Sequence, residues 1–501
     1  MILAAAIAGC ASSRRREPTA VQPQFDRVEA LVSTGCYACL AEAVQLYARG
    51  PSGSRMHERA IRQRQLALTL MAFRERELAL PNSGADRAVI AIPWASPLPL
   101  DVFAMVLRQL DDRDKPIDTD SPAPADATTT ALTQLLTKPA TRNVAVAYAL
   151  AITCPRPASS DIPASSDWWV QIRRANLSLR YAELTCSTAA AADDASVFIE
   201  RDPRFAEVHY QSGLAALYHG QLISAHEQFA LAWKGLPHSA VVTLSLANTS
   251  LALSRFEEAL HLFTAPHGLN GQPSALLGQA KALTYLGRHV EAVTILSSLI
   301  ERSAPSPGEN YYWRAWNLLS MSQSQAAHKD ALEALRFWPS SHVERLAGLT
   351  ARALAQYNEA RVHFTQALAL DPGDCESRSY LAQMDAKDNM LRKALDGLDA
   401  SASCFNRAIA DQEAALLAGV VKAQAGEILR LEQWQASSLY GAAIVAKVLG
   451  QRELALGYAR RLLGDPRLGG LARDFILDID VPATTGDPSI LSVGIARPPS
   501  S

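Results

Sequence analysis

The stretch from Ser341 to Asp374, SHVERLAGLTARALAQYNEARVHFTQALALDPGD, contains the pattern that decides the fold. With its first residue as position one, small residues stand at positions eight (Gly348) and twenty (Ala360), and Phe364 stands at position twenty-four. Two small residues let antiparallel helices approach closely, and the large ring fills the space beside them. Pro372 at position thirty-two ends the second helix, because proline lacks a backbone N–H. The stretch therefore predicts a pair of packed helices.

The same pattern recurs at steps of 33 to 35 residues between positions 205 and 370. One helix pair cannot cover its own apolar face, so successive copies must stack. An alanine-rich bundle with accidental periodicity is the alternative, but fixed offsets that agree in several copies favour a repeat array. The residues at positions eight and twenty of the other copies are Gly213 and Ala225, Ala247 and Ala259, Ala280 and Ala292, Ala315 and Ala327, Ala382 and Ala394, and, in a late copy, Ala443 and Ala455.

These offsets resemble the tetratricopeptide (TPR) repeat. The resemblance implies an all-α fold, a right-handed α-solenoid of TPR helix pairs at 201–465. A less regular helical region with degenerate repeats and loops is expected at 25–200, and a C-terminal helix with a disordered tail at 466–501. The resemblance further implies a non-catalytic scaffold or adaptor that binds a peptide or protein through its concave face, in assembly of an envelope or secretion complex.

In TPR proteins, positions two, five, nine and twelve of each first helix line the concave face. These positions give Glu207 and, as predicted partner-binding residues, Tyr210, Asn248, Lys281, Tyr312, Trp316, Arg345 and Arg352. Aromatic residues and arginines anchor many interfaces, and cationic donors suit acidic groups, so the later members predict a patch for an acidic peptide. The alternative is that Trp313 and Trp316 pack between helices while the charged side chains are solvated.

The N-terminal sequence Ile7-Ala8-Gly9-Cys10 follows an apolar run and resembles the lipobox of bacterial lipoproteins. The resemblance implies a signal remnant at 1–10, lipidation of Cys10, a tether at 11–24, and a lipid-anchored protein of the bacterial envelope facing the periplasm or cell surface. The basic n-region of a signal peptide is missing, so either the start lies upstream of Met1 or the match is chance. A chance match would leave the protein cytoplasmic.

The other six cysteines form three neighbouring pairs in the sequence, and an even number is compatible with disulfides in an oxidising compartment. Buried free thiols are the alternative. For the Cys-x-x-Cys pair, a structural disulfide is expected first, a structural thiol pair second and a redox site third. The predicted pairs are Cys36 with Cys39, Cys154 with Cys186, and Cys375 with Cys404.

The chain has a formal net charge of -2 and 20% charged residues, which gives no general electrostatic reason to bind nucleic acid or anionic membranes. No internal apolar run reaches the roughly 18 residues of a membrane span. Membrane contact is therefore expected only through the lipid anchor.

Recognisable catalytic motifs are missing from the sequence. His57-Glu58 and His226-Glu227 each begin an H-E-x-x-H pattern that lacks its second histidine. The sequence thus predicts no catalytic residues, no metal and no cofactor. The alternative is an enzyme or enzyme subunit with an unrecognised site in residues 81–200, which convergent polar side chains in a pocket would favour.

Outside the array, apolar periodicity predicts helices at 25–33, 37–47, 55–80, 101–110, 142–153 and 168–185. Residues 88–92 run into several prolines and are expected to be extended. Residues 111–130 are acidic and rich in Pro, Ser and Thr, which predicts a loop. Within the array, residues 405–431 are expected to form one long helical segment that matches the repeat poorly.

Overall fold

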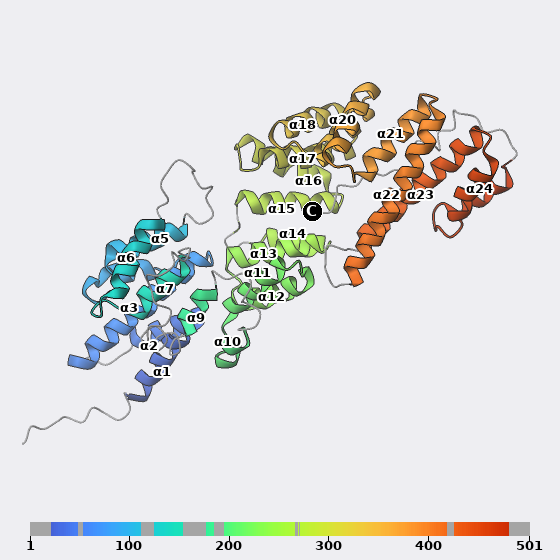
Figure 1. Ribbon diagram of the computed structural model, residues 1–501. Coiled ribbons are helices and arrows are strands. Elements are labelled where there is room, and N and C mark those ends of the chain that lie inside the picture. The colour runs from blue at the N-terminus through green and yellow to red at the C-terminus, as the bar shows by residue number, and fades with distance from the viewer. Residues whose placement is uncertain are drawn as a thin grey trace, which may run out of the picture. The chain divides into compact units, whose positions relative to one another are not determined.

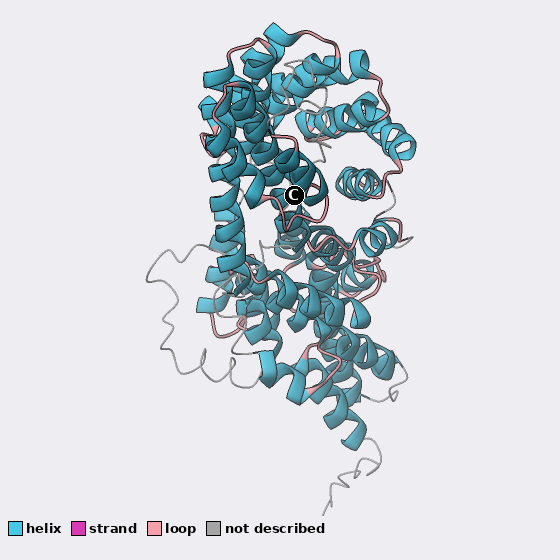
Figure 2. Cartoon of the chain, turned by 90° about the vertical axis from the view of Figure 1, so that its right-hand side faces the viewer, coloured by secondary structure: helices cyan, strands magenta, loops and turns pink. Residues whose placement is uncertain are grey.

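The computed structural model describes residues 22–48, 54–111, 125–153, 177–184, 195–265, 269, 271–417 and 425–479. Within these ranges every regular element is a helix, and no strand is present (Figures 1 and 2). None of the described helices is long and apolar enough to span a bilayer. The prediction of an all-α fold is therefore confirmed.

The described residues form two compact units. The first contains the chain up to Ala215 together with Leu231–Ser239, and the second contains Ala216–Ala230 and the chain from Ala240 onward. The division falls inside the first repeat copy, whose helices are α11 (Ala206–Tyr218) and α12 (Leu222–Gly235).

In the first unit, α3 is the central helix, and it packs against α1, α2, α4, α5 and α7. Phe73 of α3 lies with its ring centroid 5.5 Å from Phe103 of α5 and 6.3 Å from Tyr148 of α7. The helices of this unit before the first repeat copy are α1 (Gln22–Thr34), α2 (Tyr37–Ala48), α3 (Ser54–Glu77), α4 (Ala85–Ala91), the 3-10 helix η1 (Pro93–Ala95), α5 (Leu100–Asp111), α6 (Ala125–Thr137), α7 (Val144–Ile152), α9 (Leu177–Leu184) and α10 (Ala195–Arg201).

Two expected loops are partly helical. Residues 88–92, expected to be extended, lie mostly in α4, which starts after Gly84 in the left-handed conformation (φ 84°). The Gln65 side chain of α3 donates to the carbonyl oxygens of Val89 and Ile92, both at 3.3 Å, and so satisfies the end of α4. Residues 125–130 of the second expected loop belong to α6. The hydrogen bonds from Gln65 to α4 join residues far apart in the sequence, so local composition does not predict them.

In the second unit, consecutive helices pack as antiparallel pairs, and each pair packs on the next. The pairs are α13 (Ala240–Ala252) with α14 (Phe256–Phe263), α15 (Pro273–Tyr285) with α16 (His289–Glu301), α17 (Pro307–Ser320) with α18 (Ser324–Phe337), α19 (Ser341–Ala353) with α20 (Tyr357–Leu370), α21 (Cys375–Lys387) with α22 (Leu391–Leu417), and α23 (Ala425–Val448) with α24 (Arg452–Arg461), followed by α25 (Gly469–Leu477).

Burial confirms the repeat register. The glycine at position eight of the best copy, Gly348, lies so close to Phe364 that an added Cβ would be 2.7 Å from the ring. Positions eight and twenty-four therefore meet as the sequence predicts. The alanines at position twenty are fully buried in every copy: Ala225, Ala259, Ala292, Ala327, Ala360, Ala394 and Ala455.

The turn between the two helices repeats as well. In every copy the residue five places before the position-twenty alanine adopts the left-handed conformation, with φ between 58° and 76°. Glycine pays no Cβ penalty there, whereas Ala355 does. The residues concerned are Gly220, Ser254, Gly287, Ser322, Ala355, Asn389 and Gly450.

One copy carries a helical extension. The step from Ala394 to Ala455 is 61 residues, far longer than the usual 33 to 35. The extra residues lengthen α22 and α23 beyond the repeat, at 405–417 and 425–435. The single segment expected at 405–431 is thus two helices. Phe405 and Trp434, one from each, stack with centroids 6.0 Å apart.

Candidate functional site: the face of the first helices

The first helices of consecutive pairs lie side by side. α13 packs on α15, α15 on α17, α17 on α19, and α21 on α23, and Arg345 of α19 pairs with Glu376 of α21. We call their positions two, five, nine and twelve the A face. Its residues in the second unit fall into two stretches. Those of α17 to α23 are mostly buried, and we call them the closed stretch; those of α13 and α15 are mostly half-buried or exposed, and we call them the open stretch.

The closed stretch contains a chain of ion pairs that begins at Asp374. This residue follows the Pro372-Gly373 end of α20 and caps α21, accepting from the Ser377 backbone N–H at 3.1 Å. Its carboxylate also accepts from Arg345 Nη1 at 2.8 Å. The cap of one copy is thereby joined to the A face of the preceding copy.

Glu376 continues the chain. It lies 3.6 Å from Arg345 Nε and is paired with Arg430 of the helical extension. Arg430 also donates to Glu427 at 2.6 and 2.9 Å. Burial opposes the charge on Arg345, but Glu376 and Asp374 outweigh it and raise the pKa of the guanidinium. These charges are paired with each other and are not held out toward solvent.

The aromatic members of the predicted patch are core residues. Tyr312 and Trp316 are 2% and 3% exposed, and the Tyr312 ring lies 5.5 Å from Trp338. Burial raises the pKa of the Tyr312 hydroxyl, which Arg345 partly offsets. The expected exposed patch of Tyr312, Trp316 and Arg345 is therefore corrected: neighbouring helices and carboxylates of the chain itself cover these side chains.

Arg352 has a chain-internal partner as well. Its guanidinium carbon lies 4.4 Å from the ring centroid of Tyr380, a cation–π distance. Tyr380 also stacks on Phe364 at 5.0 Å and contacts Trp434 edge-on at 5.3 Å. The guanidinium thus covers one ring of the closed stretch.

The earlier copies keep the A face open. At position nine, Asn248 of α13 is exposed and Lys281 of α15 is half-buried. Lys281 pairs with Glu309 at 2.6 Å and lies 5.7 Å from the ring centroid of Trp313. At position five, Leu244 and Leu277 are half-buried. Tyr210, also half-buried, belongs to the first unit.

Several residues that contact the closed stretch were not predicted from the sequence. Glu376 stands at position two of its copy and could have been found by the same offset, and Asp374 could have been found as a helix cap after Pro-Gly. Arg430 and Trp434 lie in the helical extension, where the repeat offsets do not apply. Only the structure shows which residues Arg430 and Trp434 contact.

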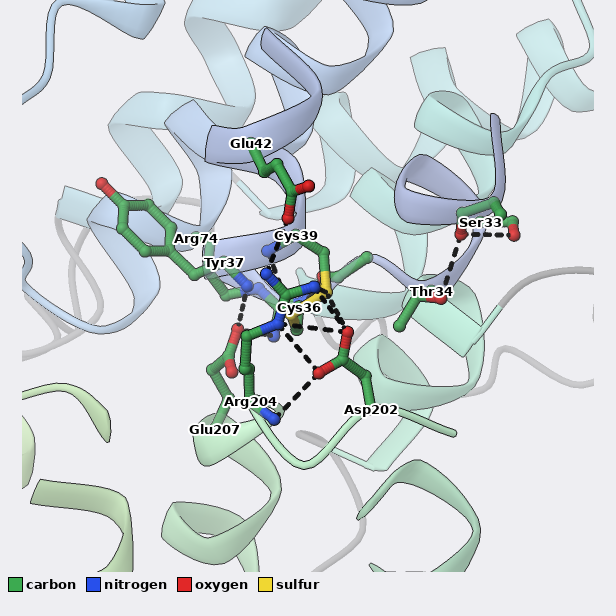
Figure 3. Close-up of a disulfide and its surroundings, with 12 residues drawn as sticks. Ser33, Thr34, Cys36, Tyr37, Cys39, Glu42, Arg74, Asp202, Arg204 and Glu207 are labelled. Carbon is green, nitrogen blue, oxygen red and sulfur yellow. Dashed lines mark hydrogen bonds and ion pairs between the residues drawn. A yellow bond between two sulfur atoms is a disulfide. The ribbon is translucent and has the colours of Figure 1, made fainter. Parts of the chain in front are cut away.

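A buried arginine joins the helices of the first unit to the start of α11 (Figure 3). Arg74 is fully buried, lies 3.5 Å from Glu207 and sits 3.7 Å above the Tyr181 ring. Glu207 accepts from the Tyr37 backbone N–H at 2.6 Å, at the first residue of α2. Burial raises the pKa of the Glu207 carboxyl, and Arg74 opposes this rise. The cluster fixes α2 and α3 onto the first repeat helix.

Disulfides join two of the three predicted cysteine pairs, Cys36 with Cys39 and Cys375 with Cys404. The third predicted pair, Cys154 with Cys186, lies outside the described residues, as does Cys10. Cys36 and Cys39 are fully buried, and the other described pair is 7% and 6% exposed.

His226 lies beside a serine and a glutamate, residue types that form catalytic triads in hydrolases, but the geometry differs from that of a triad. Ser250 Oγ and Glu258 Oε1 both lie 3.1 Å from the same ring nitrogen, Nε2. A catalytic histidine needs its nucleophile and its carboxylate on opposite nitrogens. The contacts join α12, α13 and α14 and act as a link between copies.

The region 81–200, where the enzyme alternative placed its site, is described only in part. Its described helices α6, α7 and α9 pack successively on one another, and α5 packs on α3 and α6. They contribute apolar residues such as Val106, Leu136 and Tyr181 to the first unit's core. Successive packing of this kind is the arrangement expected for degenerate helix pairs.

Comparison with known proteins gives structural likenesses only. No family model and no curated protein matches the sequence. Among solved structures, the APC/C hetero-tetramer Cut9–Hcn1 is similar at 14% identity and a TM-score of 0.40, over 90% of this chain and 89% of that chain. A tetratricopeptide repeat protein from Parabacteroides merdae is similar at 15% identity and a TM-score of 0.34, over 55% of this chain and 98% of that chain. At these TM-scores the repeat fold rests on the register and packing described above.

Proposed function

We propose that the protein is a binding scaffold whose open A face, over α13 and α15, receives a segment of a protein partner. The observation that carries this proposal is the difference in side-chain exposure between the two stretches of the A face. Position nine is exposed at Asn248, whereas the same position two copies later is Trp316, only 3% exposed. Within the described parts of the chain, side chains cover the closed stretch, whereas Asn248 of the open stretch stays exposed.

The chemistry of the open stretch suits a partner segment of mixed character. Leu244 and Leu277 offer aliphatic area that is already half-buried, so covering them costs little rearrangement and removes apolar surface from water. The Asn248 amide beside them can donate to and accept from a peptide backbone. Lys281 is held by Glu309 and is less available as a free cation.

We further propose that the scaffold is lipid-anchored through Cys10 in a bacterial envelope, where it serves assembly of an envelope or secretion complex. The lipobox resemblance of residues 7–10 supports the anchor. The two disulfides among the described residues support an oxidising compartment, because such bonds are rare in reducing cytosol.

Site-specific photo-crosslinking in living cells tests the partner surface. A photoreactive amino acid at Asn248 is expected to form a crosslink to a discrete protein, since this side chain points from the open stretch. The matched control is the same amino acid at Val362, which is 54% exposed on the second helix α20. The proposal fails if position 248 gives no crosslink, or if both positions capture the same proteins equally.

A further inference from the structure

The disulfide between Cys36 and Cys39 does little for the stability of the fold. It closes a loop of only four residues at the start of α2, and the constraint a disulfide places on the unfolded chain grows with loop length. The same turn is already held by the backbone hydrogen bond from Leu40 N–H to the Cys36 carbonyl at 2.8 Å. The Cys375–Cys404 disulfide, with a sequence separation of 29, constrains far more chain.

Charged side chains surround one sulfur of this pair (Figure 3). Cys39 Sγ lies 3.4 Å from Asp202 Oδ2 and 3.9 Å from Arg204 Nη2. Arg204 donates to Asp202 at 2.7 Å and to Glu42 at 2.7 Å, and its side chain is 44% exposed. The half-exposed Arg204 side chain therefore separates Cys39 Sγ from solvent on this side.

The other sulfur is placed to accept negative charge. Cys36 Sγ accepts from the Cys39 backbone N–H at 3.0 Å, immediately before the first turn of α2. Thiolates at helix N-termini are stabilised by such donors and by the helix dipole. Cys36 is therefore the better leaving group of the two, and Cys39 the sulfur for an incoming thiolate to attack.

We propose that Cys36–Cys39 is a reversible redox centre that exchanges with dithiol reductants through Cys39. A reductant thiolate attacks Cys39 Sγ and forms a mixed disulfide, and the electron pair of the broken S–S bond leaves on Cys36. The second thiolate of the reductant then attacks the reductant sulfur of the mixed disulfide, and Cys39 leaves as a thiolate. Two protons from the reductant end on the two cysteines, and the reductant becomes a disulfide.

The reduced state has a partner in place. A Cys39 thiol at the observed position can donate to Asp202 Oδ2, whereas the disulfide sulfur cannot. Reduction therefore changes a contact in the segment that leads from Asp202 to Glu207 and α11. A small disulfide such as oxidised glutathione reverses the exchange.

Differential alkylation with mass spectrometry on the full chain tests the proposal. Native protein is incubated with dithiothreitol, new thiols are trapped over time, and both disulfides are followed in the same molecules. Cys36–Cys39 is expected to open at least tenfold faster than Cys375–Cys404, which is also almost buried and serves as the internal control. Equal rates, or faster opening of Cys375–Cys404, would overturn the proposal.

Two variants separate the charge of Arg204 from its bulk. Arg204→Gln is expected to slow opening of Cys36–Cys39 by about fivefold or more, because it leaves the Asp202 carboxylate beside Cys39 without its cation, and that carboxylate repels the attacking anion. Arg204→Lys keeps the charge and should stay within about twofold of the native rate. If the Gln and Lys variants open at the same rate, Arg204 has no electrostatic role and the route through Cys39 is wrong.

Discussion

Ala360 shows at the scale of one residue why the repeat is readable from the sequence. It is fully buried at the crossing of α19 and α20, where only a small side chain fits. We expect Ala360→Leu to lower the free energy of unfolding by about 1 to 3 kcal/mol through overpacking. Urea unfolding followed by circular dichroism measures this, with the exposed Val362→Leu as the control. Unchanged stability of Ala360→Leu would contradict the register.

The left-handed turn residue allows a prediction of opposite sign. Ala355 has φ 60°, a conformation that costs an alanine about 1 to 2 kcal/mol, so Ala355→Gly should stabilise the protein by up to about 1 kcal/mol after the entropy of glycine is counted. The matched change, Gly287→Ala at φ 75°, should destabilise the protein by about 1 kcal/mol, because alanine is strained in this conformation. A steric clash adds nothing to this cost, since the added Cβ meets no atom within 4 Å. Thermal unfolding of both variants measures these changes. Melting temperatures that shift in the same direction in both variants would contradict the backbone strain assigned to this turn.

Single residues also mark the limit of prediction from sequence. Gly348 and Phe364 could be assigned because they meet each other within one helix pair. The exposure of Trp316 could not, since this residue lies in a core that also contains helices of other copies. Repeat offsets state which face a residue occupies, and they do not state whether that face is covered.

At the scale of helices, the closed A face is a packing unit. Trp316 is almost fully buried in the core around α17 and α19, so Trp316→Ala should cost about 3 to 5 kcal/mol of unfolding free energy. Chemical denaturation measures it. A loss below about 1 kcal/mol would mean that the side chain is not packed as described.

The ion pairs of the same face give a second test at this scale. Arg345→Ala leaves Asp374 without its buried cation and Glu376 with Arg430 alone, and should cost about 3 to 5 kcal/mol. Arg336→Ala, at a side chain 69% exposed and paired with Glu333, should stay within about 0.5 kcal/mol. Comparable losses for the two variants would show that the Arg345 pairs are as solvated as a surface pair.

The helical extension explains why one element was misread. Its residues lack the fixed small positions, so the sequence showed helical character and no boundary between α22 and α23. Its contribution to the A face comes through Arg430 and Trp434, which contact Glu376 and Tyr380. Insertions of this kind break the offsets on which repeat prediction relies.

At the scale of the whole molecule, the first prediction concerns anchoring. If Cys10 is the lipid acceptor as proposed, expression of the native gene should give protein that incorporates labelled fatty acid and sediments with membranes. Cys10→Ser should abolish the label, whereas Cys375→Ser should keep it. Unlabelled native protein that stays in the soluble fraction would contradict the lipoprotein proposal.

The most direct test of the scaffold function is the affinity of the crosslinked partner for a variant of the open A face. Asn248→Arg places a long charged side chain at the exposed position nine without a helix penalty, and we expect the dissociation constant to rise more than tenfold, about 1.4 kcal/mol. Val362→Arg on α20 should leave it unchanged. Isothermal titration calorimetry with the purified partner makes this measurement, and equal dissociation constants for the native protein and Asn248→Arg would contradict partner binding on the open A face.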